Sequence, residues 1–431
     1  MKVFNRIKFM SWRLGERLWV KPLLFCLLSI GAVFIAKTAD YLGLDRNIPR
    51  VNAASVETLL AILAASMLVI ATFAVASMVS AYASASSAAT PRSFTLIIAD
   101  DVSQNALSTF IGSFIYSIVA LTAAKNGFFQ ETGLATLFVL TVFVFGAVII
   151  TFVRWVDKIA RLGRLGASVE KVEAATAAAM KHRRFGSGVG GLPSARQHSQ
   201  GQAVYATTVG YVQHVDVDAL QAWAVKTNTR VAVATLPGAF AVPGRALAYV
   251  EFDAASMAEL DLNAVANAFV IGTDRVFEDD PRFGLVTLSE IAGRALSPAV
   301  NDPGTAITIV GSLVRLFVSW NDETEGPKAT KYDHVDVPLL STHDLFDDAF
   351  TAIARDGAGT VEVMLRLQKA LNVLSALGNP ALCEAALKHS RLALARAERK
   401  MDLPEDLALV REVASFSRVT RPNRPSTVID T

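Results

Sequence analysis

The sequence predicts four transmembrane helices followed by a cytoplasmic α+β domain, which has a small β-barrel- or sandwich-like part and a C-terminal helical part. The first observation is composition: of 431 residues, 52% are hydrophobic and only 19% are charged, whereas soluble proteins carry about 25% charged residues. The second is distribution, because the apolar excess lies within residues 20–153 and the remainder has an ordinary globular balance. The third is a run of short alternating segments after residue 202, typical of strands.

Four apolar segments are long enough to cross a bilayer, which takes about 20 helical residues. They are 20–36, 59–79, 106–124 and 134–153, and they define a transmembrane domain over 1–156. Ionisable side chains such as Glu57 and Lys125 lie only at the edges of these segments. Because charges at membrane depth usually mark ion-coupled transport, their absence argues against a proton-coupled transporter.

Basic residues gather before the first segment and after the fourth, which places both ends on the cytoplasmic side by the positive-inside rule. The residues before the first segment are Lys2, Arg6, Lys8, Arg13, Arg17 and Lys21; those after the fourth begin with Arg154, Lys158, Arg161 and Arg164. The sequence therefore predicts a multi-pass protein with cytoplasmic termini, in contact with the lipid bilayer.

Polar and small side chains follow one face of the third segment, and a weaker stripe follows the second. The members of this polar seam are Ser66, Ser77, Asn105, Thr109, Ser113 and Tyr116. Such residues let membrane helices approach closely, so the seam indicates helix packing. The same hydroxyl groups also suit the lining of a pore or ligand path, and both interpretations stay open here.

The second part of the chain divides by pattern. A connector helix and a Gly/Ser-rich linker are expected over 157–202, a β-rich subdomain over 203–253, a mostly helical domain over 254–419 and a disordered tail over 420–431. Helices are expected at about 281–296, from Pro303 onward, and at 342–356, 360–377, 380–401 and 404–416. One further strand-like piece, AFVIG, lies at 268–272.

The segment 274–306 contains two Asp-Pro steps, Asp280-Pro281 and Asp302-Pro303. Aspartate at the N-cap followed by proline is a strong signal for a helix start. If the two starts converge, oxygen ligands for an ion would come together. Alternatively, Arg275, Arg282 and Arg294 would pair with the carboxylates or bind an anion, helped by a helix N-terminus. The residues of this candidate site are Asp279, Asp280, Arg282, Arg294, Asn301 and Asp302.

Other chemical signatures point to no catalytic residue, metal or cofactor. The six histidines show no ligand spacing, and the two cysteines are far apart, Cys26 and Cys383. The sequence has no nucleophile elbow, phosphate loop or zincin motif. A net charge of +2 gives no indication of a nucleic-acid partner. We therefore expect a protein that is not an enzyme.

Several motifs occur in a characteristic order: PRS after the second segment, then GYVQHVD, LPGAFAVPG and DDPRFGLVTLSEIAGRALSPAVNDPGTA. This order resembles a widespread bacterial family of predicted membrane proteins with a domain of unknown function, over roughly residues 10–400. RALSPAVNDPGTA is the most specific part. The family often has glutamine where this chain has Asp279, so a role that needs an amide there does not carry over. The resemblance implies a bacterial plasma (inner) membrane location and no particular activity.

Three functions fit these observations. One is an oligomeric channel or conduit gated by the cytoplasmic domain, consistent with the polar seam and with homo-oligomer formation. The second is a membrane-anchored sensor or scaffold without a pore, which binds a small ion or ligand at its cytoplasmic domain. The third and least favoured is a membrane enzyme that uses the carboxylate cluster.

The predicted orientation can be tested by cysteine labelling of intact cells. Single cysteines introduced within 45–50 and 128–131 should react with a membrane-impermeant reagent added from outside, because these loops are predicted to lie outside. A cysteine at position 190 should react only after the cells are opened. Labelling of position 190 in intact cells would overturn the orientation.

Overall fold

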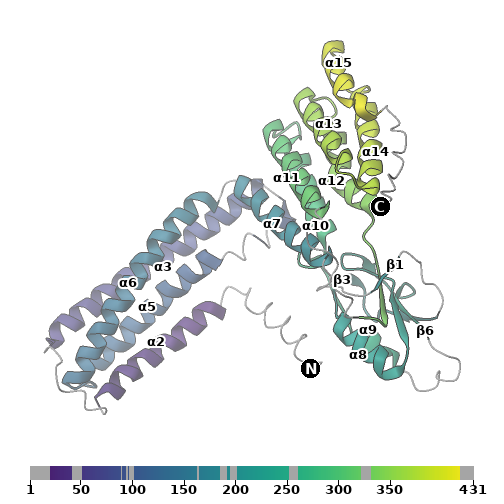
Figure 1. The fold of residues 1–431 in the computed structure, drawn as a ribbon. Helices are drawn as coiled ribbons and strands as arrows, with labels where there is room; N and C mark the ends of the chain where they lie inside the picture. The colour runs from purple at the N-terminus through teal and green to yellow at the C-terminus, as the bar shows by residue number, and fades with distance from the viewer. Residues whose placement is uncertain are drawn as a thin grey trace, which may run out of the picture. The chain divides into compact units, whose positions relative to one another are not determined.

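The computed structural model describes residues 20–40, 51–88, 90–93, 96, 101–162, 165–184, 192–194, 201–251, 261–321 and 332–417. The chain forms two compact units, an N-terminal unit, Met1–Ser168, and a C-terminal unit, Val169–Thr431 (Figure 1). The predicted disordered tail, 420–431, and much of the predicted Gly/Ser-rich linker lie outside the described residues.

Four long helices build the N-terminal unit: α2 (Val20–Ala39), α3 (Ala53–Ala88), α5 (Asp101–Lys125) and α6 (Glu131–Leu162). A short 3-10 turn, η1 (Pro91–Ser93), follows α3. Each predicted apolar segment falls inside one of these helices, so the helical prediction is confirmed. All four meet the length and hydropathy of a membrane span, but so does a fifth helix, α11 (Pro303–Asn321). By length and composition there are therefore five candidate spans among the described residues.

Helix α5 is the centre of the N-terminal unit, because it packs against both α2 and α3. A Cβ atom at Gly112 would lie 3.1 Å from Phe25 Cβ and 3.2 Å from Ser29 Oγ, so glycine is what lets α5 approach α2. The Tyr116 hydroxyl lies 3.0 Å from Thr141 Oγ1 of α6. Large apolar side chains are exposed on α3 and α6 instead. Polar groups inside and apolar groups outside are the arrangement that lipid requires.

The end of α2 is tied to the start of α6 through Asp40. Its Oδ1 accepts from the backbone N–H of Gly133 at 2.5 Å, and its Oδ2 accepts from the backbone N–H of Gln130 at 3.1 Å. Lys37 Nζ lies 3.1 Å from the same carboxylate. This carboxylate satisfies N–H groups that the first turn of a helix leaves without partners.

The C-terminal unit contains two β-sheets. Its strands are β1 (Leu192–Ser194), β2 (Gln202–Tyr205), β3 (Gly210–Val215), β4 (Arg230–Val233), β5 (Phe240–Ala241), β6 (Ala246–Glu251), β7 (Phe269–Gly272) and β8 (Val335–Pro338). The larger sheet has the order β1-β8-β4-β6-β2 and the smaller one β5-β3-β7. Strand β8 is parallel to both β1 and β4, whereas the other pairs are antiparallel.

The sheets correct the predicted barrel-like subdomain in two ways. The described strands form two separate sheets, and neither strand order closes on itself. The strands are also not confined to 203–253, because β1 and β8 come from segments before and after it. The strand-like piece predicted at 268–272 is confirmed as β7. Strand β8 was missed because it is only four residues long and its partners, β1 and β4, are distant in sequence. Its inclusion depends on tertiary pairing rather than on local pattern.

Helix α8 (Val217–Thr227) also departs from the predicted run of strands, because it separates β3 from β4. Asp216 caps its start by accepting from the backbone N–H of Ala219 at 3.0 Å, and Asn228 ends it in the left-handed conformation. Leu220 and Trp223 are buried in the core between this helix and the sheet. The sequence contains both capping residues, Asp216 and Asn228, but the alternating pattern before Asp216 favours strands and does not predict this helix.

The remaining helices agree with the sequence. They are α9 (Leu262–Ala266), α10 (Pro281–Ala295), α11, α12 (Thr342–Asp356), α13 (Val361–Ser375), α14 (Pro380–Ala397) and α15 (Pro404–Val413), and the 3-10 turn η3 (Ala414–Ser417) follows. The five helices predicted with both ends, at 281–296, 342–356, 360–377, 380–401 and 404–416, are confirmed within a few residues. Phe317 of α11 packs against Phe346 and Phe350 of α12, with ring centroids 4.5 and 5.7 Å away.

Candidate functional site

Three motifs that are far apart in the sequence come into contact at Asp279 and Asp280, where α10 begins. DDPRFG supplies both aspartates, GYVQHVD supplies His214 on β3, and LPGAFAVPG supplies Gly238. Helix α7 (Leu165–Arg184) adds His182 from its last turn. The side chains of both aspartates are almost completely buried. Burying two adjacent carboxylates is costly unless partners compensate them.

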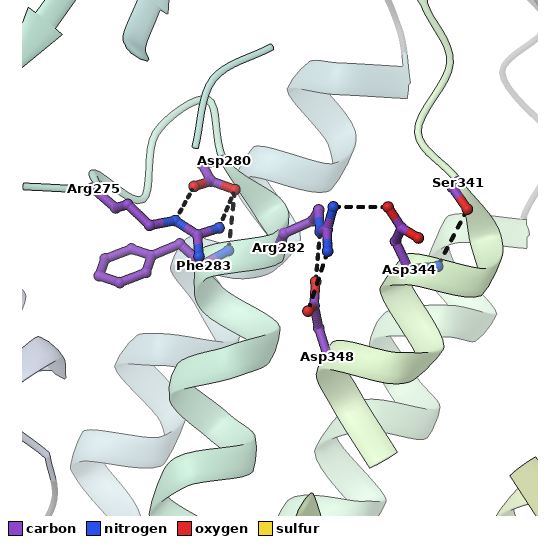
Figure 2. Close-up of polar contacts among 7 residues, drawn as sticks. All are labelled: Arg275, Asp280, Arg282, Phe283, Ser341, Asp344 and Asp348. Carbon is purple, nitrogen blue, oxygen red and sulfur yellow. Dashed lines mark hydrogen bonds and ion pairs between the residues drawn. The ribbon is translucent and has the colours of Figure 1, made fainter. Parts of the chain in front are cut away.

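Asp280 is compensated by Arg275 and by the helix that it caps. Its carboxylate accepts from Arg275 Nε at 2.7 Å and Nη2 at 3.0 Å, and from the backbone N–H of Phe283 at 3.1 Å (Figure 2). The Arg275 guanidinium also lies 5.1 Å from the centroid of the Phe283 ring. Burial raises the pKa of Asp280, although Arg275 and the Phe283 N–H oppose this effect. The predicted capping role and the predicted pairing with Arg275 are both confirmed.

Gly238 closes the turn over the Asp280 carboxylate. Its φ of +89° lies in the region that favours glycine, and a Cβ atom there would overlap Asp280 Oδ2. Its backbone N–H donates to the Val212 carbonyl at 2.8 Å, which fixes the turn against β3. Gly244, which also follows a proline and has the same φ, has no atom within 4 Å of its equivalent Cβ position.

Asp279 is held between two histidines. His182 Nδ1 lies 2.9 Å from Asp279 Oδ1, and His214 Nδ1 lies 2.5 Å from Asp279 Oδ2. Burial would raise the pKa of Asp279, but the hydrogen bonds from His182 and His214 outweigh it and lower the pKa to about 2. Burial would lower the pKa of His214, but the hydrogen bond and charge of Asp279, with the charge of Asp216, raise it overall. The cluster therefore favours a carboxylate and an imidazolium.

Arg183 follows His182 and lies beside the same carboxylates. Its Nη2 donates to the Pro338 carbonyl at 3.3 Å. Burial lowers the pKa of Arg183 to about 10, although the charges of Asp279 and Asp280 favour the cation. The guanidinium thus adds a second positive charge, after Arg275, to the surroundings of the aspartate pair.

Helix α7 is attached to the rest of the C-terminal unit at two further places. Glu173 accepts from Arg315 Nε and Nη2 of α11, both at 2.7 Å. Thr176 packs directly on Gly284 of α10, where a Cβ atom would overlap the Thr176 side chain. The hydrogen bond of His182 to Asp279 completes this series of contacts along α7.

The second predicted helix start does not converge with the first. Asp302 accepts from the Thr305 backbone N–H at 3.0 Å, and its own N–H donates to the carbonyl of Ala295, the last residue of α10, at 2.8 Å. Helix α10 has 15 residues, so roughly 22 Å of helix separates Asp280 from Asp302. Asp302 is a partly buried cap, and hydrogen bonds from Thr305 lower its pKa. Asn301 lies beside it with a left-handed φ of 48°.

The two predicted arginines also lie apart. Arg282 pairs with α12 instead of the aspartate pair, with Nη1 2.8 Å from Asp344 Oδ2 and Nε 2.6 Å from Asp348 Oδ2 (Figure 2). Ser341 caps α12 at the same end by accepting from the Asp344 backbone N–H at 3.3 Å. Arg294 is exposed in the last turn of α10, near Asp302. The six predicted residues therefore occupy two ends of α10 and do not form one site.

The polar seam of the N-terminal unit is largely engaged within helix packing. Ser113 and Tyr116 are buried, and the hydroxyls of Ser66 and Thr109 donate to carbonyls one turn earlier. Asn105 is exposed. Ser77 instead lines an open pocket of about 560 Å³ between α3 and α6. The other lining residues are Ala76, Ser80, Ala81, Ser84, Ile159 and Ala160.

The histidines are the part of the site that sequence reasoning missed. His182 and His214 lie 97 and 65 positions from Asp279, so no local spacing could reveal them. The motif GYVQHVD was the one available signal. Among the described residues, no group of three or more His, Cys, Asp or Glu side chains is arranged to hold a metal ion. The carboxylate of Asp279 between two imidazoles can exchange protons with either of them.

Comparison with known proteins supplies the context for this site. Residues 15–373 match the family described as "Predicted membrane protein (DUF2254)". Uncharacterized proteins of Mycobacterium tuberculosis (strains CDC 1551 / Oshkosh and ATCC 25618 / H37Rv) and Mycobacterium bovis (strain ATCC BAA-935 / AF2122/97) are 34% identical over 108 residues. That match covers 24% of this chain and 20% of each relative, so the chain spans a fifth of the relatives' length. No solved structure matches.

Gly238→Ala should destabilise the protein more than Gly244→Ala. Both changes place a Cβ atom at the same φ, which costs roughly 1–2 kcal/mol, but only the first forces a Cβ atom onto the Asp280 carboxylate. An extra cost of about 1–3 kcal/mol is expected from this overlap. The measurement is thermal unfolding of the full chain in detergent. Equal costs for the two variants would contradict the close contact.

Stability should fall as the pH rises from 6 to 9, and Asp279→Asn should flatten this slope. The pKa of His214 is raised above 6.5, so its contribution is complete below about pH 6.5 and is lost as the pH rises through the raised value. The pKa of Asp279 is lowered, so its contribution is lost only as the pH falls from about 4 toward 2. One proton gives a slope of at most about 1.4 kcal/mol per pH unit.

The control for this pH series is Asp302→Asn, because Asp302 caps a helix away from the histidine–aspartate cluster and asparagine caps equally well. That variant should keep the slope of the wild type. If Asp279→Asn and the wild type give parallel curves between pH 6 and 9, the histidine–aspartate cluster does not titrate as described.

Proposed function

This chain belongs to the family of predicted membrane proteins DUF2254, and we propose that it is a bacterial inner-membrane sensor whose C-terminal unit responds at the aspartate pair. In this proposal four helices anchor the protein, both termini are cytoplasmic, and the response is transmitted through α7. The main observation behind this proposal is that α7, which follows the last apolar helix of the N-terminal unit, bears one member of the buried cluster, His182.

The contacts of α7 support transmission. Glu173, Thr176 and His182 attach one helix to α11, α10 and the aspartate pair in turn. A change in charge at Asp279 alters the last of these attachments directly. Because α7 begins at Leu165 and α6 ends at Leu162, only two residues lie between the responding helix and the helix that leaves the membrane. A rigid helix is an effective carrier of such a change.

The count of four spans rests on the surroundings of α11. Its side chains Ile309, Leu313 and Phe317 are completely buried within the C-terminal unit. Arg315, on the same helix, forms an ion pair with Glu173. A lipid-facing helix would expose its apolar side chains and avoid such a charge. These features support α11 as a core helix of the C-terminal unit, and an even number of spans agrees with the basic residues at both ends.

A sensor is favoured over a pore because the seam residues Ser113 and Tyr116 are already enclosed by neighbouring helices of the same copy. One observation favours an oligomeric channel as the second candidate. The open pocket on α3 and α6 exposes Ser77, Ser80 and Ser84, and hydroxyl groups at this place would suit a water-filled path between copies.

The test is hydrogen exchange of the full chain in lipid nanodiscs at pH 6 and pH 8.5, corrected for the intrinsic effect of pH on exchange. In the wild type, the amides of α7 and of the last turns of α6 should be protected severalfold better at pH 6. Asp279→Asn should abolish this difference, whereas Asp302→Asn should retain it.

Two outcomes would contradict the proposal that this protein is a sensor. One is protection in α6 and α7 that is the same at both pH values in the wild type. The other is ion flux through wild-type protein in liposomes that Ser80→Leu, in the open pocket, blocks without disturbing α7, because that result supports the channel instead.

A further inference from the structure

The guanidinium of Arg183 is incompletely satisfied. Its Nη1 is buried and meets no hydrogen-bond acceptor within the part of the chain that the structure describes. Its Nη2 makes one long hydrogen bond, 3.3 Å to the Pro338 carbonyl. A guanidinium offers five N–H donors, and an unpaired donor on a buried cation is costly. A ligand that offered an acceptor to Arg183 Nη1 would therefore be stabilised by this guanidinium.

The nearby carboxylates do not supply that acceptor. Asp279 is engaged by His182 and His214, one on each oxygen. Asp280 is engaged by Arg275 and by the first turn of α10. Both carboxylates act on Arg183 through their charges, but neither accepts one of the hydrogen bonds that the structure gives to Arg183. Both carboxylates are therefore already hydrogen-bonded to other donors.

His182 provides a second donor beside Arg183. Its Nδ1 is committed to Asp279, so the other ring nitrogen, Nε2, lies on the opposite edge of the imidazole. The side chain is 40% exposed, which leaves this edge within reach of a ligand. His182 and Arg183 both lie in the last turn of α7, and both interact with Asp279, His182 by a hydrogen bond and Arg183 through charge.

The charges around this place are close to balanced. The two negative charges of Asp279 and Asp280 are balanced by the two positive charges of Arg183 and Arg275. Protonation of His214, which its raised pKa favours, then offsets the charge of Asp216. Arg282 adds no positive charge here, because it pairs with two carboxylates, Asp344 and Asp348. The unpaired Nη1 of Arg183, and not a surplus of positive charge, is therefore what favours an anion.

We infer that Arg183 and His182 form a binding site for an anion of the phosphate class, whose oxygens would supply the acceptor that Arg183 Nη1 lacks. Guanidinium groups bind phosphate oxygens through parallel hydrogen bonds and keep their charge at all relevant pH values. This inference rests on the proposed sensor, since it names the chemistry of the ligand that would act on α7. The phosphate could be free or carried by a lipid headgroup, and the test separates these sources.

The first arm uses the full chain in nanodiscs of zwitterionic lipid at pH 6.5, titrated with inorganic phosphate against sodium chloride of equal ionic strength. Phosphate should raise the unfolding temperature saturably and chloride should not, because only a ligand that prefers the folded state stabilises it. Arg183→Gln and His182→Gln should each weaken the apparent affinity at least about tenfold, the effect of one lost charged contact. Arg355→Gln is the matched control, because Arg355 pairs with Asp356 on the surface.

The second arm replaces the lipid by an anionic phospholipid without added phosphate. If the lipid headgroup is the source, this lipid alone should stabilise the wild type more than Arg183→Gln, and free phosphate should add little further. Should Arg183→Gln fail to fold, line broadening of the phosphorus-31 resonance of phosphate by the wild type still reports binding, and Arg183→Lys replaces the variant.

Absence of stabilisation and of line broadening in both arms would overturn the site, as would equal binding by the wild type and by Arg183→Gln. Phosphate binding that leaves the hydrogen exchange of α6 unchanged would retain the site but reject the sensor. A pH-dependent exchange of α6 without phosphate binding would retain the sensor and reject this ligand.

Discussion

The C-terminal unit is organised by the need to compensate two adjacent carboxylates that are withdrawn from water at the start of α10. A buried charge is tolerated only when ion pairs and hydrogen bonds replace the lost solvent. Asp279 takes its partners from α7 and β3, and Asp280 takes its partners from Arg275 and the first turn of α10. The turn at Gly238 then closes over the second carboxylate. These elements are held in register because each supplies one part of the compensation.

Helix α10 connects the aspartate pair to other helices of the C-terminal unit. Its first turn carries the aspartate pair, its side contacts α7 at Gly284, and Arg282 connects it to α12 through two carboxylates. At its other end the carbonyl of Ala295 accepts from the amide of Asp302, which sets the start of α11. The long motif that runs from DDPRFG to NDPGTA is therefore one helix with two different junctions. Its first junction is a buried charged cluster, and its second is a partly buried cap.

The two units use polar groups for different purposes. In the N-terminal unit, hydroxyl groups and Gly112 lie between helices and allow close approach, while apolar side chains cover the outside. In the C-terminal unit, polar groups form a charged cluster in which a proton or an anion would change the balance. This contrast is why we assign anchoring to the first unit and response to the second. Helix α7 belongs to the charged cluster through His182 and to the span α6 through the chain.

The sequence by itself determined the apolar helices, most helix boundaries and the capping roles of Asp280 and Asp302, because these depend on interactions within three or four residues. It named Arg275 as one of three arginines that could pair with the aspartates, and the structure pairs it with Asp280, five positions away. The tertiary structure alone decided the strand order, the separation of the two helix starts and the histidine pair around Asp279. His214 and His182 lie 65 and 97 positions from Asp279. Hydrogen bonds over such separations depend on how the whole chain folds, which local sequence patterns do not specify.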